Sequence, residues 1–442
     1  MKRRGYQKFM ERKKKVAGKR VVGIDPASQK HQVVVLDEDG MQIGRSFAFP
    51  VSYEGYEIKL WKELTRILGS YGPEDLVFAI ETSCALWKSF TDYASDKGYT
   101  VLLLSPLTTY HSRPLMNNDF SKTDPKDALI IATNARNGSY TEYRQFDPEV
   151  NALHRLSIAY EKVVKDRQKA VARLRALMEG VFPEYLSCIG VDTNGSLYLL
   201  ERYFLPEHFQ KLSVREKEKD LWRISNGNHS APTLLKLQSL AQRSIGSHTQ
   251  GEEEVLRLTL DIWIMQVQQT EKSLKILSAA MIERAKKTEH FEILISLKGI
   301  SDLTASRFIA ECRDLNDFDH YKQIEKYAGA NVRLMDSGNY AGTRRISKIG
   351  NKRLLRLLYL MTTQTVKFIP EIRNKFITRQ LKKKCYRKNI IAASPWLLKL
   401  IMALIKERRP YVFREETVRE TKKLEAKYTD MRNREKKMRD AA

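Results

Sequence analysis

The sequence predicts an α/β domain at its N-terminal end, followed by a mostly helical region. Two observations support this prediction. Short, apolar, β-branched segments alternate with helical patterns over residues 19–135, whereas from about residue 146 apolar residues recur every three or four positions. With 442 residues, 42% of them hydrophobic, the chain is long enough for two or three domains with their own cores.

Composition favours a nucleic-acid partner. The net charge of +25 and the pI near 9.7 indicate a polyanion, and nucleic acid is favoured over an anionic membrane surface. No membrane span is expected, because the longest apolar run, 390–405, is interrupted by Pro395 and Lys399. The first residues lack the apolar segment of a signal peptide. The four scattered cysteines predict neither a disulfide framework nor a zinc site, and a reducing cytoplasm fits them.

The order of elements predicts the topology of the α/β part. Residues 21–24, 33–36 and 42–49 are expected to form an antiparallel meander of three strands. The elements after them alternate, with helices at 53–69, at 85–97 and from 124, and strands at 76–80 and 99–104. Three strands, then helix, strand, helix, strand and helix, is the order of an RNase H-like sheet.

Four acidic residues fall at the ends of these elements. Asp25 and Glu81 each follow a strand, and Asp124 and Asp127 open a helix in which Asp124 is expected to be the N-cap and Pro125 the first helical residue. Four carboxylates that converge repel one another unless a cation lies among them. Their oxygens suit one or two Mg²⁺ or Mn²⁺ ions acting on a phosphodiester. Taken singly, each acid also fits an ordinary turn or helix-start residue.

The middle of the chain predicts long helices. Apolar heptads run from Leu153 to Val181 and from Leu256 to Met281, and they indicate a coiled coil within one chain or between chains. The segment between them, 184–250, is expected to be a small helical insertion with a flexible tail. Residues 1–18 are basic and are expected to be disordered or ordered only on phosphates, and residues 411–442 to be a charged helix that orders on a partner.

The C-terminal half contains several basic motifs. Residues 294–310 resemble a helix-hairpin-helix, whose tight turn at Lys298 would approach a phosphate. A loop or hairpin at 332–342 precedes a helix, and residues 371–388 are basic and suit a nucleic-acid groove. The residues expected to contact nucleic acid are Lys122, Lys126, Lys298, Arg344, Arg345, Lys348, Lys352 and Arg353. A solvated basic face is the alternative for the last five.

Six motifs occur together and in a fixed order: VVGIDPAS, FAIETSCALW, SKTDPKDALIIA, ISLKGISDLTA, YAGANVRLMDSG and RRISKIGNKRLLRLLYL. With these motifs the chain resembles the DEDD-type transposases of the insertion sequence 110 family, whose relatives include Piv-like DNA invertases. The resemblance implies an RuvC-like RNase H fold, then a coiled coil, then a small transposase domain. The expected boundaries are a basic tail at 1–18, an RuvC-like catalytic domain at 19–145, a coiled-coil region with a helical insertion at 146–288, a transposase domain at 289–410 and a charged tail at 411–442.

The resemblance also implies a site and its partners. Asp25, Glu81, Asp124 and Asp127 would be the metal-binding tetrad, and Ser337 the nucleophile that joins to a DNA phosphate. Members of the family are guided by a structured bridge RNA that pairs with target and donor DNA. The expected partners are therefore both DNAs, the bridge RNA and further copies of the chain in a homodimer or homotetramer, without a membrane. Cys84 and Asn331 depart from the family pattern, and a Ser-Gly pair alone would be read as an ordinary turn.

The expected function is therefore that of a DNA transposase or recombinase that cuts and rejoins strands through a phosphoserine. Three alternatives stay open. The first is an RuvC-like, metal-dependent endonuclease of the Holliday-junction type, which uses water as its nucleophile. The second is a DNA invertase of the Piv type. The third is a non-catalytic nucleic-acid-binding protein, in which the four acids are structural and binding is sensitive to salt.

Overall fold

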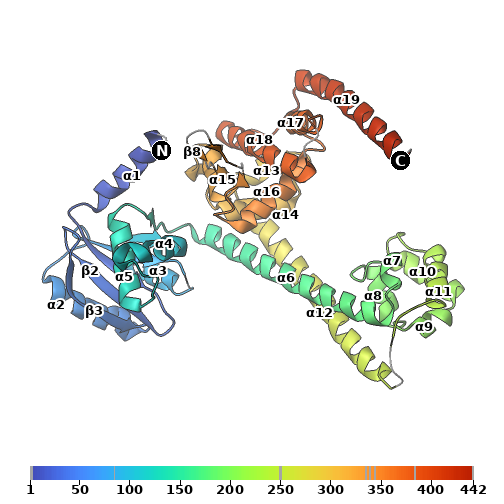
Figure 1. Ribbon diagram of the computed structural model, residues 1–442, viewed down its shortest axis with the longest axis horizontal. Helices are drawn as coiled ribbons and strands as arrows, with labels where there is room; N and C mark the ends of the chain where they lie inside the picture. The colour runs from blue at the N-terminus through green and yellow to red at the C-terminus, as the bar shows by residue number, and fades with distance from the viewer. Residues whose placement is uncertain are drawn as a thin grey trace. The chain divides into compact units, whose positions relative to one another are not determined.

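The chain forms two compact units, Met1–Gln145 and Phe146–Ala442 (Figure 1). The structure is a computed structural model that describes residues 3–83, 85–247, 251–333, 336–337, 340–342, 345–382 and 385–440. The first unit is a mixed α/β domain and the second is mostly helical, which agrees with the predicted fold class at this level.

The first unit is built on one six-stranded sheet. Its order is β3-β2-β1-β4-β5-β6. The predicted antiparallel meander of β1, β2 and β3 is present, and β4 and β5 run parallel to β1. The sixth strand was not predicted and pairs antiparallel with β5. The strands are β1 (Arg20–Asp25), β2 (Lys30–Leu36), β3 (Gln42–Pro50), β4 (Leu76–Glu81), β5 (Thr100–Leu104) and β6 (Thr141–Glu142).

Helices cover both faces of this sheet, because successive side chains of a strand point to opposite sides. Val21 packs with α5 (Asp124–Arg136) on one face, whereas Val22 packs with α2 (Leu60–Leu68) and α3 (Trp87–Asp96) on the other. A short π-helix, Gly55–Lys59, precedes α2. The fourth helix, α4 (Pro106–Asn117), was not predicted.

Two predictions about the first unit were wrong in detail. Thr123, not Asp124, is the N-cap of α5, because Thr123 has the extended backbone of a cap and Asp124 is already helical. Residues 1–18 were expected to be disordered, but Arg3–Val16 form helix α1. This helix packs on its own unit: Val16 is buried, and the Tyr140 hydroxyl donates a hydrogen bond of 2.9 Å to the Arg12 carbonyl.

A buried histidine supports the loop after β1. The Ala27 backbone N–H donates to His31 Nδ1 at 3.3 Å, and His31 Nε2 lies 3.0 Å from the Tyr56 hydroxyl. The Nδ1 atom must therefore accept, which excludes a proton there. Burial lowers the pKa of His31 from 6.5 to about 4.

The His31 environment predicts acid sensitivity. Because the folded pKa is the lower one, the unfolded chain binds more protons between pH 6.5 and 4, and stability is lost as the pH falls through that range. We expect a loss of up to about 3 kcal/mol. Urea unfolding across this pH range measures the slope, which should flatten in His31→Gln and persist in the exposed control His111→Gln. An unchanged slope in His31→Gln would contradict the assignment.

The second unit begins with two long helices, α6 (Pro148–Val181) and α12 (Glu253–Ala285). They pack side by side and antiparallel within the chain, since Arg284 pairs with Glu149 at 2.5 Å and Arg167 with Glu271 at 2.8 Å. Their supercoiling as a coiled coil stays a prediction. The segment between them forms α7 (Tyr185–Cys188), α8 (Asn194–Leu200), α9 (Pro206–Gln210), α10 (Val214–Ile224) and α11 (Ala231–Ala241). Its apolar side chains share one core with the adjoining parts of α6 and α12.

The remaining helices share one core with the adjoining ends of α6 and α12. Helix α18 is long and apolar enough to cross a membrane by length and composition, contrary to the prediction, but Ile390, Leu397 and Ile401 are fully buried in this core. Helix α19 (Glu415–Asp440) packs on α17 (Pro370–Gln380), with Leu424 and Tyr428 against this core, and its ordering on a partner stays a prediction. The helices are α13 (Phe291–Ile295), α14 (Asp302–Cys312), α15 (Tyr321–Tyr327), α16 (Lys352–Thr365), α17 (Pro370–Gln380), α18 (Tyr386–Glu407) and α19 (Glu415–Asp440).

Candidate active site and nucleic-acid interface

Two of the predicted acids lie next to each other at one edge of the sheet. β1 and β4 are parallel neighbours, and Ile24 is in register with Ile80. Asp25 and Glu81 are the next residues along these two strands, so both stand at the carboxyl ends, where functional groups of such sheets commonly collect. Glu81 is 9% exposed, and Asp25 is half-buried.

Helix α5 brings the other two acids to the same edge. A side chain at Gly23 would place its Cβ 2.3 Å from the Ala128 carbonyl oxygen and 2.7 Å from the Ala132 Cβ, so only glycine permits this approach of α5 to β1. Asp127 immediately precedes Ala128 and is 2% exposed, while Asp124 is exposed in the first turn. The close helix–strand contact therefore positions these acids beside the end of β1.

The electrostatics of Asp25 support this convergence. Its pKa rises from 3.8 to about 7, chiefly because the carboxyl is buried and because Asp127 and Glu81 are negatively charged; Asp124 adds to the rise, and the positive charge of Lys122 opposes it. The charges of Glu81, Asp124, Asp127 and Lys122 thus all act on the Asp25 carboxyl. Perturbation of this kind is typical of functional sites.

An arginine that the sequence did not indicate occupies part of this site. Arg113 of α4 binds Asp127 with both nitrogens, Nε to Oδ1 at 2.9 Å and Nη2 to Oδ2 at 2.8 Å. Both side chains are largely buried, and Asp127, Glu81 and Asp25 all favour the charged guanidinium, which raises the pKa of Arg113. Arg113 therefore supplies positive charge among the acids.

The four acids are the candidate ligands for a metal ion at this site. The donors are carboxylate oxygens alone, which is the ligand type that Mg²⁺ and Mn²⁺ prefer. Among the residues that the structure describes, however, no group of three or more His, Cys, Asp or Glu side chains is arranged to hold an ion. The donor chemistry thus fits a divalent cation, whereas the arrangement, with Asp127 engaged by Arg113, does not form a closed ligand set.

Two lysines flank this site in the sequence. Lys122 is exposed and close enough to lower the pKa of Asp25. The Lys126 ammonium donates to the Asp119 carbonyl at 2.9 Å, which holds the loop that leads into α5. Lys122 is therefore the better placed of the two to meet a phosphate beside the acids.

The predicted nucleophile lies in a small hairpin of the second unit. Ser337 ends strand β8 (Asp336–Ser337), which pairs with β9 (Tyr340–Ala341) so that Ser337 is opposite Tyr340. An outer pair, β7 (Val332–Arg333) and β10 (Arg345–Ile346), encloses it. The predicted hairpin is thus present in the described part, while its Gly338 connection lies outside the described residues.

The base of this hairpin is fastened by close backbone contacts. The Lys348 N–H donates to the Gly329 carbonyl and the Asn351 N–H to the Tyr327 carbonyl, each at 2.8 Å. A Cβ at Gly350 would lie 2.4 Å from the Tyr327 carbonyl oxygen, so no other residue fits there. The chain enters and leaves the Ser337 segment at one fixed point.

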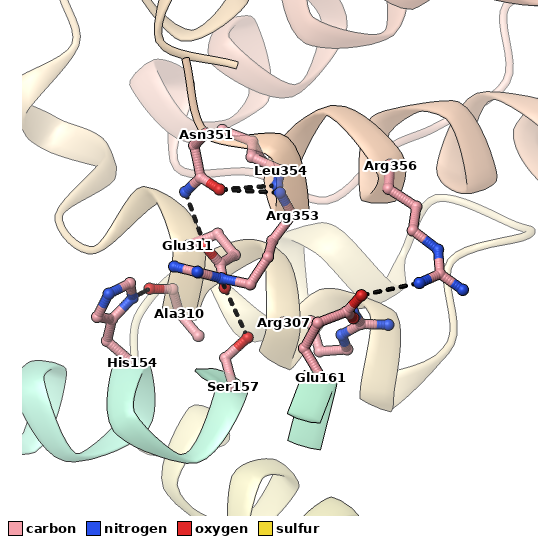
Figure 2. Close-up of polar contacts among 10 residues, drawn as sticks. All are labelled: His154, Ser157, Glu161, Arg307, Ala310, Glu311, Asn351, Arg353, Leu354 and Arg356. Atoms are coloured by element: carbon pink, nitrogen blue, oxygen red, sulfur yellow. Dashed lines mark hydrogen bonds and ion pairs between the residues drawn. The ribbon is translucent and has the colours of Figure 1, made fainter. Parts of the chain in front are cut away.

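A buried carboxylate ties this point to two helices (Figure 2). Glu311 of α14 is 1% exposed and accepts hydrogen bonds from Arg353 Nε at 2.8 Å, Ser157 Oγ at 2.8 Å and Asn351 Nδ2 at 2.7 Å. Asn351 is in turn the N-cap of α16 and accepts from the Arg353 and Leu354 backbone N–H groups. Glu311 therefore joins α6, α14 and the start of α16.

A second buried carboxylate repeats this arrangement one turn further along α6. Glu161 accepts from Arg307 of α14 and Arg356 of α16, both at 2.8 Å (Figure 2). His154 Nδ1 lies 2.9 Å from the Ala310 carbonyl at the end of α14. The three helices are thus joined by two paired acids rather than by apolar contact alone, which fixes their relative rotation more closely.

Loss of Glu311 is expected to be costly. Burial favours its neutral form, but hydrogen bonds from Arg353, Asn351 and Ser157 keep its pKa below 4.5, so this stabilisation is present above pH 4.5 and is lost as the pH falls through the lowered pKa. We expect Glu311→Ala to lower the free energy of unfolding by about 3 kcal/mol, since it leaves polar partners unpaired. Denaturant unfolding measures this. The exposed control Glu292→Ala should change it by less than about 0.5 kcal/mol.

Of the residues predicted to contact phosphates in this unit, some are exposed and one is already paired with a buried acid. Lys298, Arg345, Lys348 and Lys352 are exposed, and Lys298 lies in the turn between α13 and α14, over the Phe368 ring at 5.2 Å. Arg353 instead pairs with buried Glu311, so a phosphate would have to compete for it. Arg344 lies outside the described residues.

Comparison with known proteins agrees with this organisation. Residues 22–183 match the DEDD transposase profile of the IS110 type, and residues 291–376 match the profile described as transposase of the IS116/IS110/IS902 family. Together the two matches span more than half of the chain.

Full-length relatives extend the similarity. The chain is 22% identical to a 44.8 kDa protein of insertion element IS116 from Streptomyces clavuligerus, covering 88% of this chain and 95% of that protein. It is 21% identical to a 42 kDa protein of insertion element IS900 from Mycobacterium paratuberculosis, covering 88% and 96%. The α/β domain, the helical region and these matches define a transposase, an enzyme that acts on DNA. The chain belongs to the IS110 family.

Proposed function

We propose that this transposase cuts and rejoins the DNA of a mobile element through a covalent phosphoserine at Ser337. In this proposal Asp25, Glu81, Asp124 and Asp127 form an acid pocket that binds Mg²⁺ or Mn²⁺. The observation that carries it is the placement of four acids at one end of the sheet by β1, β4 and α5, where burial first and then the neighbouring acids raise the pKa of Asp25. The sheet order, with an antiparallel meander followed by parallel strands, supports an RuvC-like RNase H fold for residues 19–145.

The metal is a separate element of the proposal. When bound, a divalent cation would neutralise the acids and polarise the phosphodiester oxygens. Asp25 and Glu81 are the strand-end ligands that could hold it, with Asp124 exposed beside them. For Asp127 to join them, Arg113 would have to release its carboxylate. Until then the guanidinium compensates the charge of Asp127 in the folded chain.

In the proposed reaction, Ser337 exchanges one phosphodiester bond of the DNA for a phosphoserine bond. The Ser337 hydroxyl oxygen forms a bond to phosphorus, one bridging P–O bond of the DNA breaks, and the released strand end leaves as a hydroxyl. The serine proton passes to a base near the acids, and the released strand end takes up a proton. Attack by a strand-end hydroxyl on the phosphoserine then rejoins DNA and restores the serine. The phosphodiester energy is retained, so no nucleotide cofactor is needed.

The acids and the serine belong to separate compact units. We propose that assembly on nucleic acid brings them together, in one chain or between the chains of a homodimer or homotetramer, with the α6–α12 pair acting as a coiled coil. The net charge of +25 supports a large polyanionic scaffold. By resemblance, that scaffold includes a bridge RNA that selects target and donor DNA.

The experiment that tests this function looks for a protein–DNA adduct. The full chain is incubated with end-labelled DNA carrying the element's junctions, its flanking non-coding RNA and Mg²⁺, then denatured and separated by size. We expect labelled DNA attached to protein, absent with EDTA, and attachment mapped to the peptide that contains Ser337. Cleavage to free ends without an adduct would overturn the serine intermediate.

A second candidate is a metal-dependent endonuclease of the Holliday-junction type. One observation favours it: all four acids lie in the first unit, so that unit holds an acid pocket without Ser337. It predicts free 5′-phosphate ends and normal cleavage by a Ser337 variant. A Piv-type invertase would give the adduct but invert a segment, and a non-catalytic binding protein would give neither product.

A further inference from the structure

A groove in the second unit has the features of a binding site and lies apart from the proposed serine. It is bounded by α17, α18 and the segment that leads into α19, and it has a volume of about 360 Å³. Its lining includes Asn374 and Lys375 of α17, Trp396 and Lys399 of α18, and Arg414. The groove is amphipathic, with an aromatic wall and positive charge at its mouth.

Asn374, which lines this groove, has an unused hydrogen-bond acceptor. Its side chain is 6% exposed, and its Nδ2 donates to Glu420 Oε2 at 3.1 Å. A carboxylate only accepts, so this bond fixes which way the amide points. The Oδ1 atom has no hydrogen-bond partner within the described part of the chain. A buried acceptor of this kind is costly unless a ligand donates to it.

Trp396 provides an exposed aromatic surface with two cations beside it. The ring is 42% exposed, the Lys375 ammonium lies 4.3 Å from its centroid and the Lys399 ammonium 5.5 Å. The two acids of the lining are already engaged: Glu371 accepts from the Tyr411 hydroxyl at 2.6 Å, and Glu420 accepts from Asn374. Lys375, Lys399, Arg409 and Arg414 outnumber these two acids in the lining, so its net formal charge is positive.

We propose that this groove binds one unstacked nucleotide of a single-stranded nucleic acid. The base stacks on Trp396 and displaces the lysine that covers it, a base N–H donates to Asn374 Oδ1, and Lys375 and Lys399 contact the flanking phosphates. Stacking on aromatic side chains combined with backbone-tracking cations is the general mode of single-strand binding. A paired base could not enter, because its faces are covered in the duplex. The inference rests on the proposed function only in that the chain meets single-stranded nucleic acid.

The test measures how tightly the full chain binds three fluorescein-labelled probes. Each probe is 12 nucleotides long and has the same mixed sequence, as single-stranded DNA, as single-stranded RNA or as a DNA duplex. We expect Trp396→Leu to weaken single-strand binding about 5- to 150-fold and to leave duplex binding within about 2-fold. Trp396→Phe should retain single-strand binding within about 3-fold, because a ring remains. Trp222→Leu, at an exposed tryptophan of α10, is the matched control and should change nothing.

Two further readouts keep the proposal falsifiable. Asn374→Leu should also weaken single-strand binding, which covers the case in which Trp396→Leu fails to fold. The probe that loses affinity, RNA or DNA, identifies the natural source of the strand. Unchanged single-strand binding in both variants, or an equal loss on duplex, would overturn the proposal. An acidic peptide that binds the unaltered chain and loses affinity equally in both variants would also overturn it. Ser337→Ala should bind all probes normally, so failure here is distinguishable from failure of the phosphoserine proposal.

Discussion

Replacing Ser337 by alanine is expected to abolish the protein–DNA adduct and to reduce strand cleavage by at least about 10³-fold, because no other group would supply the attacking oxygen. Ser337 lies in the β8–β9 pair, which the separate β7–β10 pair brackets in sequence, and the chain after β10 is held by Asn351 and Glu311. Removal of one hydroxyl should leave this framework intact. Binding of DNA and the free energy of unfolding should therefore match those of the unaltered chain, which adduct trapping, gel-shift titration and denaturant unfolding can measure together.

The matched control for this experiment is Ser347→Ala. Ser347 lies ten positions further along the same segment, its N–H donates to the Asn331 carbonyl at 2.8 Å, and its hydroxyl accepts from the Ile349 N–H at 3.4 Å. It should keep near-normal cleavage. Robust cleavage by Ser337→Ala would refute the phosphoserine and favour a water nucleophile. Loss of activity in both variants would show that the segment tolerates no change and would leave Ser337→Cys, with its own nucleophile, to decide.

Asp25→Asn is expected to reduce cleavage by about 10³-fold while making the first unit more stable. Burial and the neighbouring acids raise the pKa of Asp25 to about 7, so folding disfavours its ionised form. For an acid whose pKa is raised, this cost appears as the pH rises from 3.8 to 7 and is complete above 7. Asparagine carries no charge, and at pH 8 it should add about 1–3 kcal/mol to the free energy of unfolding, once partial solvent screening is allowed for.

A metal titration separates this effect from simple misfolding. Millimolar Mg²⁺ should raise the melting temperature of the unaltered chain, because a ligand that binds only the folded state stabilises it. The shift should disappear in Asp25→Asn and after addition of EDTA, and it should persist in Asp39→Asn, which changes an exposed acid in the turn after β2. A full Mg²⁺ shift in Asp25→Asn would exclude that carboxylate as a ligand.

The convergence of the four acids could be predicted from sequence because these acids are tied to strand and helix ends. Asp25 and Glu81 follow short β-branched runs, and the parallel register of β1 and β4 then brings them together without any long-range information. The close approach of α5 to β1 depends on the absence of a side chain at Gly23, and the sequence alone did not indicate this role. The distance from these acids to Ser337 was beyond the same reasoning, because no periodicity reports how two compact units meet.

The unpredicted elements have physical reasons. Helix α4 has weak apolar periodicity and contains Pro114, and the sequence analysis predicts no element there. A signal was nevertheless present: Ser105 caps the Leu107 N–H and Pro106 opens the first turn, the same signature that was recognised around Pro125. Because α4 was not predicted, Arg113 could not be placed beside Asp127. Helix α1 is highly basic, and its order depends on Tyr140, more than 120 positions away, which local composition cannot reveal.

The insertion between α6 and α12 ends close to the point where it begins. The Ser247 N–H donates to the Gly180 carbonyl at 3.0 Å, and a Cβ at Gly246 would lie 1.9 Å from the Val181 carbonyl oxygen. Entry and exit are therefore adjacent, but the core of this stretch is shared with the long helices, since Leu174 and Met178 of α6 and Leu260 and Ile264 of α12 belong to it. A short turn in its place would expose these side chains of α6 and α12, so a domain grafted there would have to cover the same apolar surface.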